Sequence, residues 1–449
     1  MSVFRAYDIR GIYPDQLNGE LAHKIGLAFG RFLGRGTVAL GADVRNSSPD
    51  LKRNVLNGLM EAGLDVMDAG TVPTPVLYFT VAYNRLDGGT MITGSHNPKE
   101  YNGIKMCGKN GVCLSYETGI MEVERLVNDD VSPRKAKGLT RKMNVEKDYM
   151  NFIVKKVNFK KPLRIVIDAG NGVAGKISCQ IFRTLGCEVT ELHCNPDGNF
   201  PNHHPDPLVR ENLKDLQARV IETESDLGIA YDGDGDRVGF VDERGKVVEN
   251  NRVFALLIEN ILMKRKGAKI VHEVLSSKLV EDVIISKGGV PVISRVGHSY
   301  IQRKMVENGC ELGGETSGHY YFRESFNYDD GIFASVKLAE LLSGSENKIS
   351  ELLEELPKYM TSDDIRVHCP DEIKFDVVKR LTKKFEGIGK IITIDGVKVI
   401  MKKSWFIVRA SNTQPALVLR WEASEAKEFE RTGNFVKTEV AKEIKKLIF

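Results

Sequence analysis

Short apolar runs alternate with amphipathic segments through the first three quarters of the chain. The apolar runs are rich in β-branched residues, as in TVALGADVR (37–45) and LRIVIDAG (163–170), and each precedes a segment with helical spacing of apolar positions. An alternation of strands and helices is typical of α/β architecture. We therefore predict α/β domains over this part of the chain.

One arrangement occurs three times: a strand, a helix, and a second strand opened by glycine. The second strands are GLDVMDAG (63–70), GCEVTELHC (186–194) and GVPVISRV (289–296), and the third unit opens with AKIVHEV (268–274). Similar spacing in the three units favours three related βαβ-containing domains. The alternative is a single long α/β chain, which would show much the same alternation.

The last quarter has a different pattern. KIITIDGVKVIM (390–401) places Asp395 and Gly396 between two apolar runs, which is a strong hairpin signal. Two more strand-like runs follow, SWFIVRAS and PALVLRWEAS, and residues 425–449 show the spacing of a charged amphipathic helix. We predict a small α+β domain at this end of the chain.

Composition limits the class of protein. A length of 449 residues suggests about two to four domains, and 42% hydrophobic with 28% charged residues is ordinary for a globular protein. The net charge is only +3, from 64 basic and 61 acidic residues. A nucleic-acid binder usually carries an excess of Lys and Arg, so none is expected here, while a local basic pocket for a small anion is compatible with this balance.

Cysteine usage and hydropathy bear on the compartment. The seven cysteines are odd in number and form no CxxC pair, which argues against a disulfide framework or a zinc knuckle and fits a reducing compartment. The first residues, MSVFRAYDIRG, lack the apolar segment of a signal peptide, and no run of about 18 apolar residues occurs. We expect a soluble cytoplasmic protein with no membrane partner.

The most acidic short motif is YDGDGDRVGF (231–240). Asp232, Asp234 and Asp236 alternate with glycines after an apolar run, and carboxylates so spaced in a Gly-rich loop can converge on one hard cation. An EF-hand is one alternative, but Arg237 stands where its sharp turn needs glycine and the flanks have the pattern of strands. A solvated acidic turn is another; mutual repulsion of three aspartates favours a metal over it.

Two further loops carry polar side chains that suit hydroxyl-rich or anionic ligands. In GGETSGHYYF (313–322), Glu315, Ser317 and His319 alternate and would share one side of an extended segment. RVGHSY (295–300) is a weaker signal of the same type, with Gly297 and His298. The alternative for these segments is a polar turn before a strand.

VRASNTQPALVLR (408–420) has the donors that bind phosphate: a guanidinium, hydroxyls, an amide and backbone N–H groups in one turn. These donors belong to Arg409, Ser411, Asn412 and Thr413. Ser-Asn-Thr is also ordinary hairpin-loop chemistry, so this loop alone leaves both interpretations open.

TGSHNP (93–98) surrounds one hydroxyl, that of Ser95, with turn-forming and polar residues. A serine nucleophile needs a base, or it must carry its phosphoryl group already. On a strand the neighbouring side chains of Ser95 and His96 would point to opposite faces, so His96 would be a poor direct base; no G-x-S-x-G elbow is present either. Lys105 follows in the same segment. A turn-capping serine is the alternative.

Taken in order, these motifs resemble the α-D-phosphohexomutase superfamily, specifically its phosphomannomutase/phosphoglucomutase group, over essentially the whole chain. The matching segments are FRAYDIRG (4–11), TGSHNPKEYNGIK (93–105), DAGNGVAG (168–175), DGNFPNHHPDP (197–207), DGDGDR (232–237), GETSGH (314–319) and RASNT (409–413).

The resemblance implies three related mixed α/β domains plus a C-terminal α+β domain around a central cleft. The expected domains are a phosphoserine-bearing domain (1–145), a metal-binding domain (146–247), a sugar-binding domain (248–360) and a C-terminal phosphate-binding domain (361–449).

The resemblance also implies roles for single residues. Ser95 would be the phosphoserine, and one Mg²⁺ would be held by Asp232, Asp234, Asp236 and the Ser95 phosphate. The sugar hydroxyls would meet Glu315, Ser317, His319, Gly297 and His298. The non-reacting phosphate would be bound by Arg409, Ser411, Asn412 and Thr413. The reacting groups would be surrounded by Tyr7, Arg10, His96, Lys105, Arg237 and His298.

The implied reaction is an isomerisation of hexose 1-phosphate and hexose 6-phosphate, with mannose and/or glucose as the sugar. Phospho-Ser95 would give its phosphoryl group to the substrate, and a hexose 1,6-bisphosphate, which also acts as activator, would turn over before its other phosphate returns to Ser95. His96 or Lys105 would be the general acid/base, and a lysine in that role needs a lowered pKa. The partners would be small hexose phosphates, and the chain a monomer or homodimer.

The chain departs from the superfamily at three positions. Gly94 stands where alanine is usual, which should loosen the loop; Gln414 replaces an acid; and Leu275 stands about where some relatives have a basic residue. Phosphoglucosamine mutase is the closest alternative, although Asn412 and Thr316 both differ from its pattern. A non-catalytic sugar-phosphate binding protein and a metal-dependent phosphatase are the others.

Overall fold

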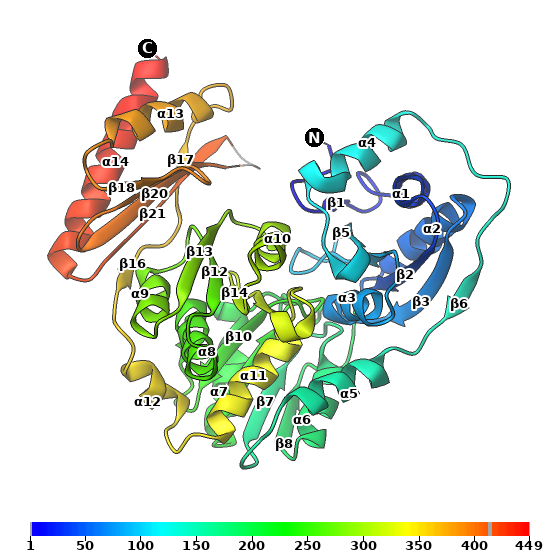
Figure 1. Cartoon of the computed structure of the whole chain (residues 1–449), viewed down its shortest axis with the longest axis horizontal. Helices are drawn as coiled ribbons and strands as arrows, with labels where there is room; N and C mark the ends of the chain where they lie inside the picture. Colours follow the sequence, from blue (N-terminus) through cyan, green and yellow to red (C-terminus); the bar gives the residue numbers. More distant parts are fainter. Residues whose placement is uncertain (1, 412–414, 449) are drawn as a thin grey trace.

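The computed structural model describes residues 2–411 and 415–448. Four domains follow one another along the chain, and Figure 1 shows them arranged in an arc. The first domain, blue to cyan, and the fourth, orange to red, form the two ends of this arc, and the second and third connect them. The predicted fold class is confirmed by this arrangement of three α/β domains and a C-terminal domain with an antiparallel sheet.

The first domain is built on a six-stranded sheet in the order β1-β5-β4-β2-β3-β6. The strands β4, β2 and β3 are parallel to one another, and β5 is antiparallel to β4. The strands are β1 (Ile9–Ile12), β2 (Thr37–Ala42), β3 (Asp65–Thr71), β4 (Gly88–Ile92), β5 (Tyr101–Gly108) and β6 (Thr140–Lys142), and the α-helices are α1 (Gly19–Leu33), α2 (Ser48–Glu61), α3 (Thr74–Tyr83) and α4 (Met121–Asn128).

The second domain has a five-stranded sheet in the order β11-β10-β9-β7-β8. Its elements are α5 (Glu146–Lys156), β7 (Arg164–Asp168), α6 (Gly175–Thr184), β8 (Glu188–Leu192), α7 (Lys214–Glu222), β9 (Leu227–Tyr231), β10 (Val238–Asp242) and β11 (Val247–Val248). The third domain has a four-stranded sheet in the order β13-β12-β14-β15. Its elements are α8 (Asn250–Lys264), β12 (Lys269–Glu273), α9 (Lys278–Ser286), β13 (Val290–Ser294), α10 (His298–Asn308), β14 (Leu312–Gly314), β15 (Tyr320–Phe322), α11 (Gly331–Ser343) and α12 (Ile349–Glu354).

The three sheets share one strand order. Each contains three parallel strands and then an antiparallel one: β3-β2-β4-β5, β8-β7-β9-β10 and β13-β12-β14-β15. In each domain the first two parallel strands are joined through a helix, namely α2, α6 or α9. The predicted threefold recurrence of related domains is therefore confirmed.

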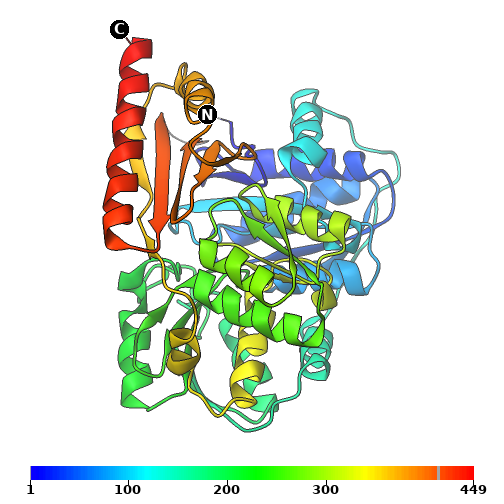
Figure 2. The same ribbon diagram turned by 60° about the vertical axis from the view of Figure 1, so that its left-hand side comes forward.

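The fourth domain is an antiparallel sheet with helices α13 and α14 packed against it. Its elements are β16 (Met360–Thr361), β17 (Ile365–His368), α13 (Lys374–Lys384), β18 (Lys390–Ile392), β19 (Val397–Ile400), β20 (Ser404–Ala410), β21 (Ala416–Ala423) and α14 (Ala426–Ile448). The predicted hairpin around Asp395 is the β18–β19 pair, and α14 is the predicted C-terminal helix. Figure 2 shows α14 along the outer side of this domain.

Buried apolar side chains hold the domains together. One continuous core includes Phe79 of α3, Phe182 of α6 and Phe333 of α11, so it joins the first three domains. A small separate cluster, in which Leu275 packs with Trp405, joins the third domain to the fourth. Among the described residues, no helix is both long enough and apolar enough to cross a membrane.

Candidate active site

The sequence motifs occupy equivalent loops of the three related domains. Ser95 lies between β4 and β5, the aspartates lie between β9 and β10, and Glu315 to His319 connect β14 to β15. In every case the loop follows the third parallel strand and leads into the antiparallel one. A repeated sheet order thus places the three polar loops at the same end of their domains, and side-chain contacts join them.

The hydroxyl of Ser95 contacts the acidic loop directly. Its Oγ donates a hydrogen bond to Asp232 Oδ2 at 2.7 Å, and the side chain is buried. Ser95 has a φ of 48°, in the left-handed region, and its N–H donates to Thr93 Oγ1 at 2.8 Å. Because this segment is a turn and not a strand, His96 does not point away: its Nδ1 lies 3.2 Å from Ser95 Oγ. The prediction that Ser95 and His96 point to opposite faces, which assumed a strand, is wrong.

Arg45, which the sequence analysis missed, fixes the shape of the Ser95 loop. The side chain is fully buried beside Asp43, and its Nε donates to Asp43 Oδ2 at 3.2 Å. Its two terminal nitrogens donate to four backbone carbonyls, those of Ser95 (2.7 Å), Asn97 (2.6 Å), Pro98 (2.6 Å) and Tyr101 (2.9 Å). An Arg beyond the end of a strand carries no distinguishing signal in a chain with many basic residues.

The guanidinium of Arg45 also accounts for Gly94. A Cβ at this position would lie 2.2 Å from Arg45 Nε and 2.3 Å from Arg45 Cζ, closer than carbon contacts allow. The N–H of Gly94 donates to Asp43 Oδ2 at 3.0 Å. The expectation that glycine loosens the loop is wrong, because the space of the missing side chain is filled by a buried, hydrogen-bonded guanidinium.

The three aspartates form a buried cluster. Asp232, Asp234 and Asp236 are all fully buried, and one carboxylate oxygen of each lies within 4.8 Å of the others. Among the described residues, Asp234 Oδ1 and Asp236 Oδ1 have no hydrogen-bond partner although both atoms are buried. Unpartnered buried carboxylate oxygens are costly unless a cation meets them. These residues therefore fit a divalent cation, and the strands on both sides of the loop make the EF-hand interpretation wrong.

Lys105 and His96 differ in protonation. Lys105 Nζ lies 3.1 Å from Asp234 Oδ2 and also contacts Asp236. Burial opposes the charge of this lysine, yet the two carboxylates raise its pKa, so the ammonium form is favoured. Burial, with the positive charges of Arg237 and Arg10, holds the pKa of His96 well below 6.5. The pKa of Lys105 is therefore not lowered as a general base would require, whereas the pKa of His96 is lowered.

The loop of the third domain places the imidazole of His319 against the three-aspartate loop. His319 Nδ1 lies 3.0 Å from Glu315 Oε2, and its Nε2 lies 3.4 Å from Asp236 Oδ1. Burial and Arg237 oppose protonation, but the carboxylates of Asp236 and Glu315 raise the pKa of His319 to about 10. Ser317 Oγ is 2.8 Å from His319 Nδ1. The three alternating residues thus lie together, as predicted.

Gly297 and His298 join the same site. The N–H of Gly297 donates to Glu315 Oε1 at 2.9 Å, and the ring of His298 lies 5.4 Å, centroid to centroid, from that of Tyr7. The sequence analysis missed Asp329, whose buried carboxylate lies 3.7 Å from both His298 and His319.

Charged side chains of all four domains act on one tyrosine. Burial and the charges of Asp8 and Glu315 raise the pKa of Tyr7, while Arg237 and Arg409 act in the opposite direction. Arg10, on β1, donates to Asp8 through its Nε at 3.2 Å. Tyr7, one of the two positions predicted to line the cleft from the first domain, thus lies near charged residues of the other three domains.

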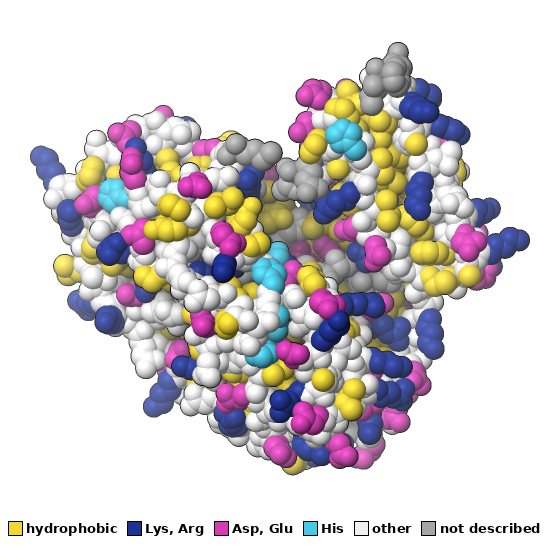
Figure 3. Space-filling model, turned by 180° about the vertical axis from the view of Figure 1, so that it is seen from behind, with side chains coloured by type: hydrophobic (Ala, Val, Ile, Leu, Met, Phe, Trp, Pro, Cys, Tyr) yellow, Lys and Arg dark blue, Asp and Glu magenta, His cyan; other side chains and the backbone are white. Residues whose placement is uncertain are grey.

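In the fourth domain, Arg409 pairs with Asp395 at 3.1 Å, and the carbonyl of the buried Ser411 accepts a hydrogen bond from Lys374 at 2.6 Å. Asn412 and Thr413, predicted for the same phosphate loop, and Gln414 lie outside the described residues. Figure 3 shows that the surface is hollowed between the first domain and the fourth.

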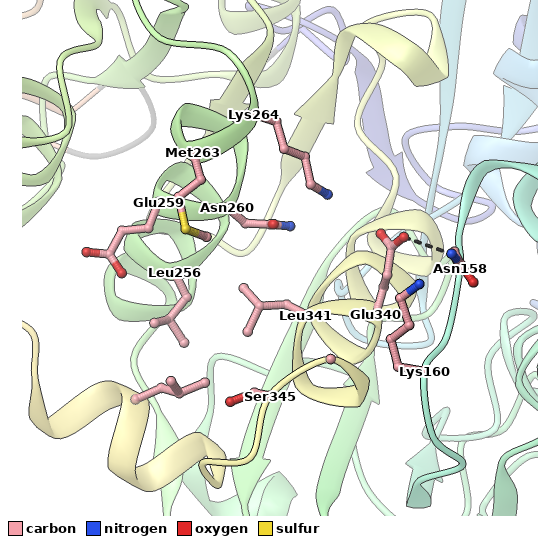
Figure 4. A pocket seen from close by; sticks show the side chains of 12 residues that line it. Asn158, Lys160, Leu256, Glu259, Asn260, Met263, Lys264, Glu340, Leu341 and Ser345 are labelled. Carbon is pink, nitrogen blue, oxygen red and sulfur yellow. Dashed lines mark hydrogen bonds between the residues drawn. The ribbon is translucent and has the colours of Figure 1, made fainter.

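A separate cavity of about 540 Å³ lies between α8, α11 and α12 (Figure 4). Glu340 and Asn158 lie at one side of it, joined by a hydrogen bond of 2.9 Å from the Asn158 N–H. Its described lining residues include none from the Ser95, aspartate or Glu315 loops, so the polar site and this cavity are distinct.

The site combines a buried serine, a three-aspartate loop, the polar Glu315 to His319 loop and cationic side chains. This combination suits phosphoryl transfer on hydroxyl-rich ligands. The chain belongs to the phosphoglucomutase/phosphomannomutase family: it matches the three alpha/beta/alpha domains over residues 1–133, 147–245 and 249–360, and the C-terminal domain over residues 365–438. It is accordingly an isomerase of the phosphohexomutase type.

Similar proteins support this membership over nearly the whole chain. The phosphomannomutase/phosphoglucomutase of Pseudomonas aeruginosa is 42% identical over 437 residues, which cover 96% of this chain and 93% of that protein. A family member of known structure from Burkholderia thailandensis has a TM-score of 0.92 at 36% identity, covering 98% of this chain and 97% of that one. The fold extends to the Aspergillus fumigatus N-acetylphosphoglucosamine mutase, solved with GlcNAc-6P and magnesium, with a TM-score of 0.61 at 14% identity over 98% and 96% of the two chains.

Proposed function

We propose that the chain interconverts mannose and/or glucose 1-phosphate and 6-phosphate through a phosphoserine at Ser95 and a hexose 1,6-bisphosphate. The observation that carries this proposal is the hydrogen bond of 2.7 Å between the buried Ser95 Oγ and Asp232. This contact supports the proposal because it holds a buried hydroxyl, a group that can accept a phosphoryl group, against the three-aspartate loop. The similar proteins named for mannose and glucose support the choice of sugar.

In the first half-reaction, a free hydroxyl oxygen of the substrate forms a bond to the phosphorus of phospho-Ser95, and the bond from phosphorus to Ser95 Oγ breaks. The hydroxyl must lose a proton and Ser95 Oγ must gain one. His96, whose pKa is held well below 6.5 and whose Nδ1 lies 3.2 Å from Ser95 Oγ, would accept the first proton and supply the second, while Lys105, whose pKa is raised by its carboxylate neighbours, would stay an ammonium. After the bisphosphate turns over, its other phosphoryl group returns to Ser95 by the reverse sequence.

The cation would be one Mg²⁺ held by Asp232, Asp234 and Asp236 together with the Ser95 phosphate. Oxygen ligands are those that Mg²⁺ prefers, and the unpartnered oxygens of Asp234 and Asp236 fit it. When bound, the cation supplies positive charge against the negative charge of the phosphoryl group that moves. Arg237, which follows the loop directly, would add to this charge.

The sugar and its second phosphate would be bound by the third and fourth domains. Glu315, Ser317 and His319, with Gly297 and His298, offer both donors and acceptors to sugar hydroxyls. The non-reacting phosphate would be bound by Arg409, Ser411, Asn412 and Thr413. Tyr7 and Arg10 would line the cleft from the first domain. Because the sugar must present either end to Ser95, a loop of many donors suits this task better than one fixed partner.

A sugar panel tests the proposal. Purified protein with Mg²⁺ and a trace of hexose 1,6-bisphosphate is assayed with mannose, glucose and glucosamine phosphates, and free phosphate is followed in parallel. We expect isomerisation of mannose or glucose phosphate without release of phosphate. Dominant turnover of glucosamine phosphate would make the chain a phosphoglucosamine mutase, net release of phosphate a phosphatase, and binding without turnover a sugar-phosphate binding protein.

A further inference from the structure

A second cluster of metal-ligating side chains lies in the second domain, outside the phosphoryl-transfer site. Asp168 ends β7, His193 follows β8, and His203 belongs to the segment between β8 and α7. One ligand atom of each of the three lies within 4.8 Å of the others. Figure 3 shows histidine side chains gathered in a row at the middle of the back face of the molecule.

The hydrogen bonds of His203 leave a position for a cation. Its Nδ1 lies 3.0 Å from the carbonyl oxygen of His204, which only accepts, so this nitrogen carries a hydrogen. A neutral ring then presents the lone pair of Nε2, and this atom lies 3.0 Å from Asp168 Oδ2. The lone pairs of His203 Nε2 and Asp168 Oδ2 would repel each other at this distance. A positive charge shared by the two atoms removes this repulsion, and it is either a second proton on the ring or a metal ion.

Only one of the two carboxylate oxygens of Asp168 is available to a cation. Its side chain is fully buried, and its Oδ1 accepts a hydrogen bond from the Gly170 N–H at 2.8 Å. Its Oδ2 is therefore the oxygen available to a cation. An Nδ1–H held by a backbone carbonyl is also the usual outer contact of an imidazole that binds metal through Nε2.

His193 completes the cluster, and Asp215 lies beside it. The rings of His193 and His203 are 5.3 Å apart, centroid to centroid, and His193 Nε2 lies 3.3 Å from Asp215 Oδ2 on α7. Both histidines are partly exposed, so an ion has access from solvent. We propose that Asp168, His193 and His203 form a second metal site for a zinc-type divalent ion, with the fourth coordination position open to solvent.

Two imidazoles with carboxylates select this class of ion. Nitrogen ligands suit Zn²⁺, Co²⁺ and Ni²⁺, whereas Mg²⁺ prefers oxygen throughout. Tetrahedral bonds of about 2.0–2.1 Å place ligand atoms roughly 3.3 Å apart, so the side chains need to close by at most about 1.5 Å from their described spacing of up to 4.8 Å. Small rotations of two partly exposed histidines can supply this movement.

A bound ion would stiffen a segment that reaches the active site. It would connect the ends of β7 and β8 to the 195–209 segment, in which Phe200 lies 5.2 Å from the guanidinium of Arg45 and Asn199 bonds to Asn46 at 2.9 Å. Arg45 in turn holds the carbonyls of the Ser95 loop. The proposed ion is therefore structural, and it supports the loop without touching substrate.

The test uses the full-length protein with excess Mg²⁺ and titrates Co²⁺, whose visible absorption reports tetrahedral coordination with nitrogen ligands. We expect one equivalent to bind with this absorption and to be displaced by Zn²⁺. His193→Asn should weaken Co²⁺ binding at least about tenfold. Asparagine tolerates the left-handed backbone of His193, whose φ is 49°, so this variant should fold. His203→Asn is the second variant.

Two controls separate this site from others. His368→Asn changes an exposed histidine of β17 and should leave Co²⁺ affinity unchanged, and Asp234→Asn, which weakens the three-aspartate site, should leave the absorption in place. The proposal is overturned if no tetrahedral absorption develops or if His193→Asn and His203→Asn bind Co²⁺ as the unaltered protein does. A proton on His203 would then account for its contact with Asp168, whose hydrogen bond and charge raise the pKa of His203 against the effect of burial.

Discussion

Replacing Arg45 by lysine tests whether a buried guanidinium shapes the Ser95 loop. Arg45 donates five hydrogen bonds, one to Asp43 and four to backbone carbonyls between residues 95 and 101. A lysine ammonium has three donors and no planar fork, so at least two acceptors lose their partner. Each buried acceptor left without a partner costs about 1–3 kcal/mol, so the loop geometry is destabilised by about 2–6 kcal/mol.

The lost hydrogen bonds lie within the Ser95 loop. We therefore expect this loop to rearrange while the four domains stay folded. A displacement of about 1 Å at a reacting group can reduce turnover about 100-fold. Arg45→Lys should therefore lower kcat by about two orders of magnitude, with an unchanged far-ultraviolet circular dichroism spectrum. The assay is isomerisation of glucose 1-phosphate at saturating substrate, with the phosphorylation level of Ser95 measured by mass spectrometry.

The matched control is Arg35→Lys, which changes an exposed arginine of the same domain and should leave kcat within twofold. If Arg45→Lys also stays within twofold of the unaltered protein, the reasoning is refuted, because the carbonyls would then not depend on the guanidinium fork. A kcat loss accompanied by unfolding would equally contradict a role confined to the loop.

Other changes have separate expected outcomes. Ser95→Ala should abolish both the phosphoryl-enzyme and isomerisation; persistent turnover would reject the phosphoserine. Asp234→Asn should reduce turnover far more than thermal stability, and equal losses would favour a structural ion or none. Burial and neighbouring positive charges hold the pKa of His96 below 6.5. We therefore expect the kcat of the unaltered protein, divided by that of His96→Asn, to be constant above pH 6.5 and to fall at lower pH as the imidazole gains its proton. A fall already at pH 8 would contradict this. Glu315→Gln removes one carboxylate from His319 and the proposed charged partner of the sugar. We expect KM to rise about tenfold with a smaller change in kcat, and an unchanged KM would place Glu315 outside the sugar site.

The polar loops could be predicted from the sequence because each concentrates unusual residues in a few positions. Aspartates alternating with glycines at 232–236, and the Glu315 to His319 run, stand out from the apolar strands on either side. Their convergence could not be predicted from spacing, because it depends on a strand order shared by three separate sheets. The hydrogen bond between Ser95 and Asp232 joins residues that are 137 positions apart.

Single functional residues without a local pattern were missed for the same reason. Arg45, two residues after Asp43, and Asp329, next to Asp330, lie in segments with the composition of ordinary polar turns, and only the folded chain shows that both are buried beside the site. The alternation rule misplaced His96 because β4 ends at Ile92 and the chain turns before Ser95. Side-chain direction follows alternation only while the backbone stays extended.

The central claim is that Ser95 carries the phosphoryl group during turnover, and rapid quenching tests it most directly. Protein phosphorylated with hexose 1,6-bisphosphate is mixed with glucose 1-phosphate, quenched at successive times, and analysed by peptide mass spectrometry. We expect a phosphoryl group on the peptide that contains Ser95, lost on mixing at a rate no slower than kcat. A phosphoryl group on another residue, or one on Ser95 that leaves more slowly than the enzyme turns over, would contradict it.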